Sequence, residues 1–318
     1  MQRLTARLRR VDGERGATAV LFALLLVPVL GFTAVAVDIG ALYAERARLQ
    51  VGADAAAIAV AQDCSRGNCG DMQATAQALI SANDSQGTAG APVLSSDPLS
   101  VTVTGGTPME HWFAPVLGID STRVSATATV GWGSPVRGTA VLPLTFSWCE
   151  FEEQTGGALP SGETVHTIYF AKTSQTTSCP GPSGNVVPGG FAYLDTDPGT
   201  CDTTTEMDGR WYSKTGNSVP SDCSTGDFSA WLDRTVLLPL FDDAGSTGNN
   251  AWYRVYGYAA FRLTGYHLGG QYSTSPKPCG GNDRCVAGYF TRFVELSDAW
   301  DYDPTAPELG SSVLRLIR

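Results

Sequence analysis

The chain has 318 residues, of which 43% are hydrophobic and 16% charged, with 36 glycines and 18 prolines. This composition excludes a disordered chain and indicates a turn-rich body with many short strands. The net charge of −10 is uneven: five arginines face two acids in residues 1–15, whereas 14 basic and 26 acidic side chains follow from residue 55 onward. Because an acidic body repels nucleic acid, we expect no nucleic-acid partner.

The first predicted element is a transmembrane helix over residues 17–37, an uncharged run of 21 residues. At 1.5 Å per residue this run is about 31 Å long, enough to cross the hydrocarbon core of a lipid bilayer. A cleaved signal peptide is the alternative, but its apolar core is shorter, roughly 7–15 residues. The arginines of residues 1–16 predict a cytoplasmic N-terminus and a single-pass membrane protein whose remainder, after Asp38, lies outside the cytoplasm.

An extracytoplasmic extension of the same helix is predicted over residues 38–63. It carries a thin, alanine-rich stripe at helical spacing, which suits close packing against a neighbouring element or another copy. A plain stalk that lifts the following domain off the membrane is the alternative. With a small residue of the span included, the packing candidates are Gly31, Leu42, Leu49, Ala53, Ala56 and Val60.

A small α+β unit is predicted over residues 64–132. The pattern favours a helix over 71–83, a strand over 100–104 that Gly105 and Gly106 end, a second helix that opens at Pro108, and a strand over 123–130.

A β-rich exported domain is predicted over residues 133–318, and its composition is typical of antiparallel strands joined by long loops. The strongest strand patterns are those of 141–149, 164–171, 234–241, 252–266 and 286–296. The predicted fold class is therefore α+β: a long N-terminal transmembrane helix that extends outward, the small α+β unit, and a mainly antiparallel, disulfide-containing β domain.

All eight cysteines lie beyond the predicted span, and an even count there is typical of disulfides in an oxidising compartment. Eight cysteines permit 105 pairings, so sequence alone does not select one. The short, glycine-containing loops favour Cys64 with Cys69 and Cys279 with Cys285, which leaves Cys149 with Cys179 and Cys201 with Cys223.

No catalytic, cofactor or metal motif stands out. The three histidines, His111, His166 and His267, accompany no Gly-x-Ser-x-Gly sequence, and no phosphate-binding loop is present. Aspartates gather at Asp195, Asp197 and Asp202 and again at Asp242 and Asp243, without the spacing of a calcium-binding EF-hand loop. We therefore predict a protein that is not an enzyme and carries no cofactor and no metal, with ordinary turn aspartates.

In the N-terminal segment, Arg15-Gly16 precedes the apolar run, Asp38-Ile39-Gly40 follows it, and the helix ends in Leu49-Gln50 and Asp54-Ala55-Ala56-Ala57. This pattern resembles that of the TadE/TadG-like proteins of Tad (Flp) pilus assembly. The resemblance covers about 50 of the 318 residues. It implies a single-pass pseudopilin or assembly accessory, not an enzyme, whose partners are the lipid bilayer and other Tad pilus or pseudopilin subunits.

Two departures from the family pattern bear on this interpretation. Members that a prepilin peptidase cleaves carry Glu five residues after the cut, where this chain has Leu21 after Gly16 or Thr18 after Gly13, so we predict an uncleaved anchor. The Asp-x-Ser-x-Ser metal motif of larger relatives is missing. Two other functions stay open: a surface hydrolase, and a surface-tethered module that binds a glycan or the cell wall through Trp252, Tyr256 and Tyr258.

Overall fold

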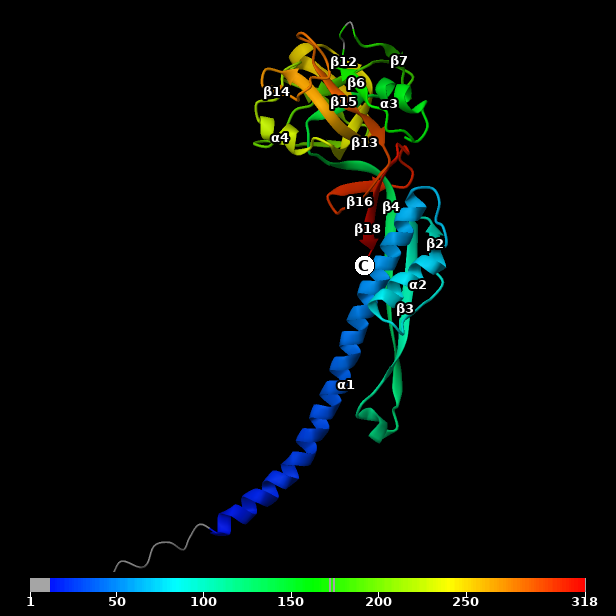
Figure 1. The fold of residues 1–318 in the computed structure, drawn as a ribbon, viewed down its shortest axis with the longest axis vertical. Helices are drawn as coiled ribbons and strands as arrows, with labels where there is room; N and C mark the ends of the chain where they lie inside the picture. The colour runs from blue at the N-terminus through cyan, green and yellow to red at the C-terminus, as the bar shows by residue number, and fades with distance from the viewer. Residues whose placement is uncertain (1–11, 172, 174, 318) are drawn as a thin grey trace, which may run out of the picture. The chain divides into compact units, whose positions relative to one another are not determined.

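A computed structural model describes residues 12–317 with the exception of residues 172 and 174 (Figure 1). Most of the predicted cytoplasmic segment, residues 1–16, therefore lies outside the described residues. The chain packs as two compact units. Unit 1 comprises Met1–Ala57, Met72–Pro92 and Thr102–Ala128, and unit 2 comprises Ile58–Asp71, Val93–Val101 and Thr129–Arg318. One long helix, mainly antiparallel sheets and four disulfides confirm the predicted α+β class.

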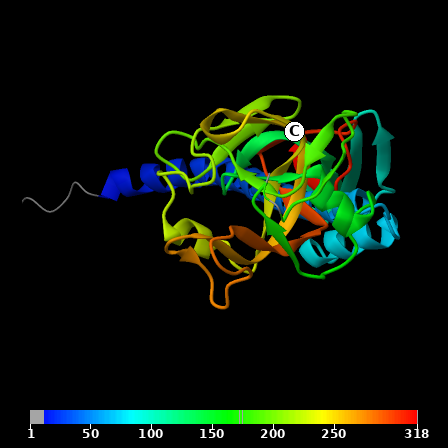
Figure 2. The same ribbon diagram turned by 90° about the horizontal axis from the view of Figure 1, so that it is seen from above.

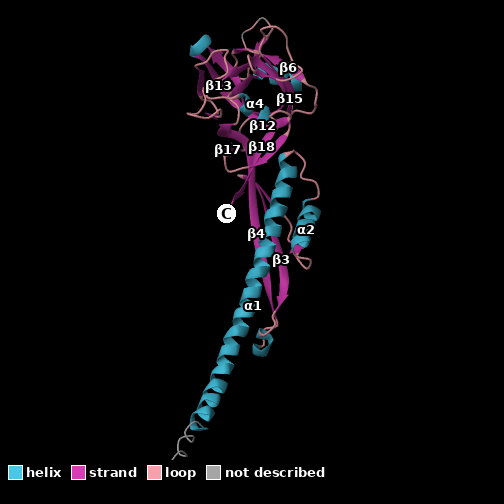
Figure 3. Ribbon diagram, turned by 60° about the vertical axis from the view of Figure 1, so that its left-hand side comes forward, coloured by secondary structure: helices cyan, strands magenta, loops and turns pink. Residues whose placement is uncertain are grey.

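Unit 1 is built on one long helix, α1 (Asp12–Ser65), whose last residues belong to unit 2. The helix continues through Pro28 and past Asp38 without interruption, so the apolar run and its polar extension form one element. Beside it lie helix α2 (Met72–Asn83), strand β1 (Thr88–Ala89), and the parts of strands β3 (Leu99–Glu110) and β4 (Ser121–Ala140) that belong to unit 1 (Figures 1 and 3).

The side chain of Ile80 on α2 fixes how these elements approach one another. Ile80 is fully buried, and a β-carbon added at Gly105 of β3 would meet its Cδ1 atom at 2.5 Å. Gly52 of α1 faces the same side chain. These glycines allow the helices and the strand to pack closely, as the interior of a well-packed protein requires.

Two predictions in unit 1 are wrong. Gly105 and Gly106 do not end their strand, because β3 continues to Glu110 and the glycines instead make room for the neighbouring helix. No helix opens at Pro108, which lies within β3; the helical turn is the 3-10 helix η1 (Ala114–Leu117). Pro115 is the second residue of that turn, which ends at Gly118 in the left-handed conformation, with φ 82°.

Unit 2 contains a sheet whose strands follow the order β6-β15-β13-β12-β5-β9, with β11 and β14 paired to β13. β12 and β5 are parallel and the other neighbours are antiparallel. The bounds are β5 (Leu144–Ser147), β6 (His166–Tyr169), β9 (Phe191–Tyr193), β11 (Arg210–Ser213), β12 (Arg234–Gly245), β13 (Ala251–Gly269), β14 (Tyr272–Ser273) and β15 (Cys285–Thr291).

Three further strands of unit 2, β10, β17 and β18, pair antiparallel with the later part of β4. The remaining bounds are β2 (Val93–Ser96), α3 (Trp148–Thr155), β7 (Ser178–Pro180), β8 (Val186–Pro188), β10 (Thr203–Glu206), α4 (Thr225–Ala230), η2 (Gly248–Asn250), β16 (Phe293–Leu296), β17 (Trp300–Asp303) and β18 (Ser311–Ile317). Figure 2 shows these strands and their connecting loops from above.

The core of unit 2 is aromatic. The ring of Phe146 contacts those of Phe191, Phe261 and Phe290, with centroids 4.6 Å apart for Phe146 and Phe261. The strand predicted over 141–149 ends sooner than expected, because the Ser147 hydroxyl accepts the N–H of Cys149 and caps helix α3. The pattern over 286–296 divides into β15 and β16, which belong to different sheets.

Candidate membrane and partner interface

The apolar part of α1 is a bare hydrophobic surface. Every large apolar side chain from Val20 to Val37 is exposed. Its mean hydropathy reaches 2.7, and α1 is the one helix in the described part of the chain that is long and apolar enough to cross a membrane. Soluble proteins rarely leave such a large continuous apolar surface uncovered, so this segment is the candidate membrane interface.

The predicted packing residues separate into two groups. Leu49, Ala53, Ala56 and Val60 are fully buried and Leu42 is half-buried, so the chain already covers most of the stripe. Gly31, by contrast, is exposed, and a β-carbon added to it would meet nothing within 4 Å. Surface for another helix therefore remains in the apolar run, around Gly31.

Asp38, the first charged residue after the apolar run, contacts the loop between β3 and β4. Its carboxylate accepts the backbone N–H groups of Trp112 (3.0 Å), Phe113 (3.1 Å) and Ala114 (2.7 Å), and only 6% of the residue is exposed. Three consecutive N–H groups on one carboxylate form a strong, charge-assisted contact between segments 74 to 76 residues apart. We call this arrangement the Asp38 clasp.

Two opposing effects act on the pKa of Asp38. Burial raises this pKa, but the three N–H donors and the nearby His111 together lower it by more. The pKa of Asp38 therefore lies below its ordinary value of 3.8. The pKa in the folded state therefore lies below that in the unfolded state. The clasp stabilises the fold at pH values above the ordinary pKa of the carboxyl group, and this contribution is lost as the pH falls through the lowered pKa.

Replacing Asp38 with alanine is expected to release the loop that follows β3. The amides of Trp112, Phe113 and Ala114 lose their acceptor, so their hydrogen exchange accelerates while exchange in β12 and β13 stays unchanged. Hydrogen exchange followed by mass spectrometry on the full chain in detergent measures this.

Asp54→Ala is the matched control, because Asp54 lies on the same helix and its carboxylate accepts a bond from Gln50 of α1. That variant leaves the three amides protected. Equal acceleration in both variants would contradict the assigned role of the clasp.

The eight predicted disulfide cysteines lie together in four pairs: Cys64–Cys69, Cys149–Cys179, Cys201–Cys223 and Cys279–Cys285. The second pair joins α3 to β7, and the third joins the two ends of a loop that contains β10 and β11. Disulfides of this kind stabilise long loops that bury little apolar surface.

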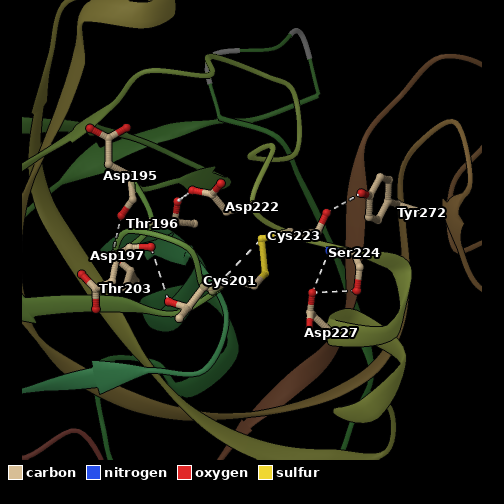
Figure 4. The surroundings of a disulfide bond; sticks show 11 residues. Asp195, Thr196, Asp197, Cys201, Thr203, Asp222, Cys223, Ser224, Asp227 and Tyr272 are labelled. Carbon is tan, nitrogen blue, oxygen red and sulfur yellow. Dashed lines mark hydrogen bonds between the residues drawn. A yellow bond between two sulfur atoms is a disulfide. The ribbon is translucent and has the colours of Figure 1, made fainter.

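The aspartates around Cys201–Cys223 bond to the protein itself (Figure 4). Asp195 accepts the Lys214 N–H and pairs with its ammonium group at 3.0 Å. Asp197 accepts the Thr204 hydroxyl. Burial, with the charges of Asp197 and Asp227, raises the pKa of Asp202. In the described part of the chain, no three His, Cys, Asp or Glu side chains lie close enough to hold a metal ion.

Glu150, in the first turn of α3, is a largely buried carboxyl group. Burial raises its pKa to about 7, although the N–H that Gly190 donates at 2.6 Å acts in the opposite direction. The folded state therefore binds a proton that the unfolded state has already released above its ordinary pKa of 4.5. The stability of the fold is expected to be greatest below that pKa and to fall as the pH rises to about 7.

Glu150→Gln should remove the loss of stability at high pH, because the amide retains the oxygen that accepts the Gly190 N–H but cannot ionise. We expect a gain of at most about 3 kcal/mol in the free energy of unfolding at about pH 8, and almost none at about pH 4. Chemical denaturation at both pH values measures the gain. Glu152→Gln, on the exposed side of the same helix, is the control and should show no pH-dependent gain.

The three aromatic residues considered for glycan binding do not form an open platform. Tyr258 is 1% exposed and its hydroxyl contacts that of Thr205 at 2.8 Å. The Arg210 guanidinium lies over the Trp252 ring, and Tyr256 packs edge-on against Trp148. Sugar-binding aromatic rings need an exposed face. These three rings are buried or packed against other side chains of the chain, so glycan binding is unsupported.

Sequence reasoning missed the hydrogen-bond partners of three buried carboxyl groups, those of Asp38, Glu150 and Asp242. Neither spacing nor composition indicates which distant N–H groups a carboxylate will accept. One signal was present: the stretch from His111 to Ile119 contains no Asp, Glu, Lys or Arg although it lies in a loop, and acids flank it on both sides.

Comparison with known proteins bears on the helix alone. Residues 16–63 match the model of the Tad family, described as "Putative Flp pilus-assembly TadE/G-like". A search of curated proteins and a search of solved structures found no match. The matched range begins at Gly16 and includes the whole exposed apolar run and the buried stripe of α1. The N-terminal segment of this chain, residues 16–63, is therefore similar to the TadE/G-like family of Flp pilus assembly.

Proposed function

We propose that this protein is a membrane-anchored component of Tad/Flp-type pilus assembly, or a minor pilin-like subunit. It acts by packing its anchor helix against other Tad components while its β-rich unit lies outside the cytoplasm. The exposed apolar run of α1, within a segment of the TadE/G-like family, carries this proposal. The same helix, which is long and apolar enough to cross a membrane, supports single-pass anchoring.

The orientation rests on charge and on redox chemistry. The arginines before the apolar run favour a cytoplasmic N-terminus, because basic flanks are retained on that side of a membrane. All four disulfides lie after the run, and disulfides persist in oxidising compartments. Both observations support export of everything after Asp38.

The face of α1 around Gly31 supports helix packing as the mode of action. Small residues allow helix backbones to approach closely inside a bilayer, where apolar burial provides no driving force. Val27 and Val35 lie one turn before and one turn after Gly31 on that face, whereas Val29 lies on the opposite face. All three valines are exposed in the isolated chain.

Site-specific photo-crosslinking in the native membrane tests the proposal. A photoreactive amino acid at position 27 or 35 is expected to crosslink to another Tad component, identified by mass spectrometry. The same amino acid in place of Val29 is the matched control and should give little protein crosslinking. If no Tad component is recovered from any of the three positions, the proposed function is wrong.

A further inference from the structure

The tip of the hairpin formed by β3 and β4 is an apolar loop with uncovered side chains. Residues 111–119 contain no Asp, Glu, Lys or Arg, and Glu110 and Asp120 flank them. Trp112 is 77% and Val116 90% exposed, and Phe113 and Ile119 are exposed as well. Four large apolar side chains around one short turn are unusual on a surface that contacts only water.

The backbone of this tip is already hydrogen-bonded. Seven of its nine residues donate their N–H to an acceptor in the chain: three to Asp38, and those of residues 111, 116, 118 and 119 to carbonyl oxygens. Pro115 has no N–H to donate. A loop can enter an apolar medium only if its backbone donors are satisfied, and the Asp38 clasp contributes three of these bonds.

The clasp also fixes where the tip lies along α1. Asp38 directly follows the uncharged run, so the tip is held at the end of the segment that crosses the bilayer. The exposed side chains of Val35, Val37 and Ile39 flank Asp38 on the helix. The apolar surface of the tip therefore continues that of the helix within unit 1.

We propose that the hairpin tip of residues 111–119 inserts into the membrane, in the interfacial region of the leaflet that surrounds residue 38. This inference rests on the membrane anchoring in the proposed function. It gives the protein a second, monotopic contact with lipid beside its transmembrane helix.

The side chains of the tip favour a shallow position in the lipid, at the membrane interface. Tryptophan and phenylalanine favour the membrane interface, where an apolar ring meets the headgroups. Glu110 and Asp120 limit the depth, because their charges stay in water or among the headgroups. Gly31 lies seven residues deeper, about 10 Å along the helix, so tip insertion and helix packing use different depths.

Spin labelling of the full chain in lipid nanodiscs tests the inference. A cysteine that replaces Val116 carries the nitroxide, and its accessibility to oxygen is compared with that to a water-soluble nickel chelate. Two matched valine positions serve as references: Val29 in the apolar run, and Val186, which is 74% exposed in β8. Non-reducing mass spectrometry verifies that all four native disulfides persist in each variant.

The expected result is a label at position 116 that favours oxygen over the chelate several-fold more than the label at 186. Asp38→Ala should reduce this preference. A water-like label at 116 beside a lipid-like label at 29 overturns tip insertion and leaves the anchor intact. A label at 116 that is shielded from both reagents also overturns it, because protein then covers the tip. A label at 29 that is not lipid-like contradicts the anchoring itself.

Discussion

Arg254→Met is expected to lower the free energy of unfolding by about 4 kcal/mol. The carboxylate of Asp242 is fully buried, and it accepts two bonds from the Arg254 guanidinium, at 3.0 Å and 2.7 Å. Removal of the arginine leaves a buried charge without its counter-charge, and the fold cannot rehydrate that charge without opening β12 and β13.

Unfolding of the full chain in detergent, followed by tryptophan fluorescence, measures this loss, because six of the seven tryptophans lie in unit 2. Arg262→Met, on the same strand, is the matched control and should cost about 1 kcal/mol or less. The double variant Asp242→Asn/Arg254→Met should recover part of the stability. A loss for Arg254→Met no larger than that of the control would show that the ion pair contributes little.

Replacing both Cys149 and Cys179 with serine is expected to lower the free energy of unfolding by a similar amount, about 4 kcal/mol. This disulfide closes a loop of 30 residues, and a crosslink that closes a longer loop restricts the unfolded chain more. The segment of β7 is the one affected, since β7 then loses its covalent link to α3.

The corresponding serine pair at Cys64 and Cys69 provides the comparison, because its loop spans 5 residues and the same relation gives about 2 kcal/mol. Thermal unfolding under oxidising conditions should therefore rank the two double variants in this order. Equal losses would indicate that loop entropy does not govern the contribution of these disulfides.

The sequence predicted well those elements whose residues alternate or repeat. The apolar side chains of 252–266 and 234–241 face the core as β13 and β12. The apolar run of 17–37 and the helical periodicity of 38–63 together correspond to α1. Such patterns follow from burial of one face of a strand or helix, so local sequence contains the required information.

Contacts between distant segments could not be predicted in this way. Pro108 resembles the start of a helix, yet strand pairing places it in β3, and the helical turn forms seven residues later around Pro115. The acceptor role of Asp38 depends on where the hairpin tip comes to lie. The alanine stripe of α1 is buried within the chain, but its sequence does not say which element covers it.

The Asp38 clasp imposes an order on the synthesis, membrane insertion and folding of this protein. Asp38 bonds to residues that are synthesised at least 74 positions later, so the carboxylate has no native partner until Trp112 has left the ribosome, and its full set only after Ala114 has followed. In the proposed orientation those residues must also be translocated first. The anchor helix is thus inserted early and its outer end is fixed late, and unit 1 can complete its folding only beside the membrane.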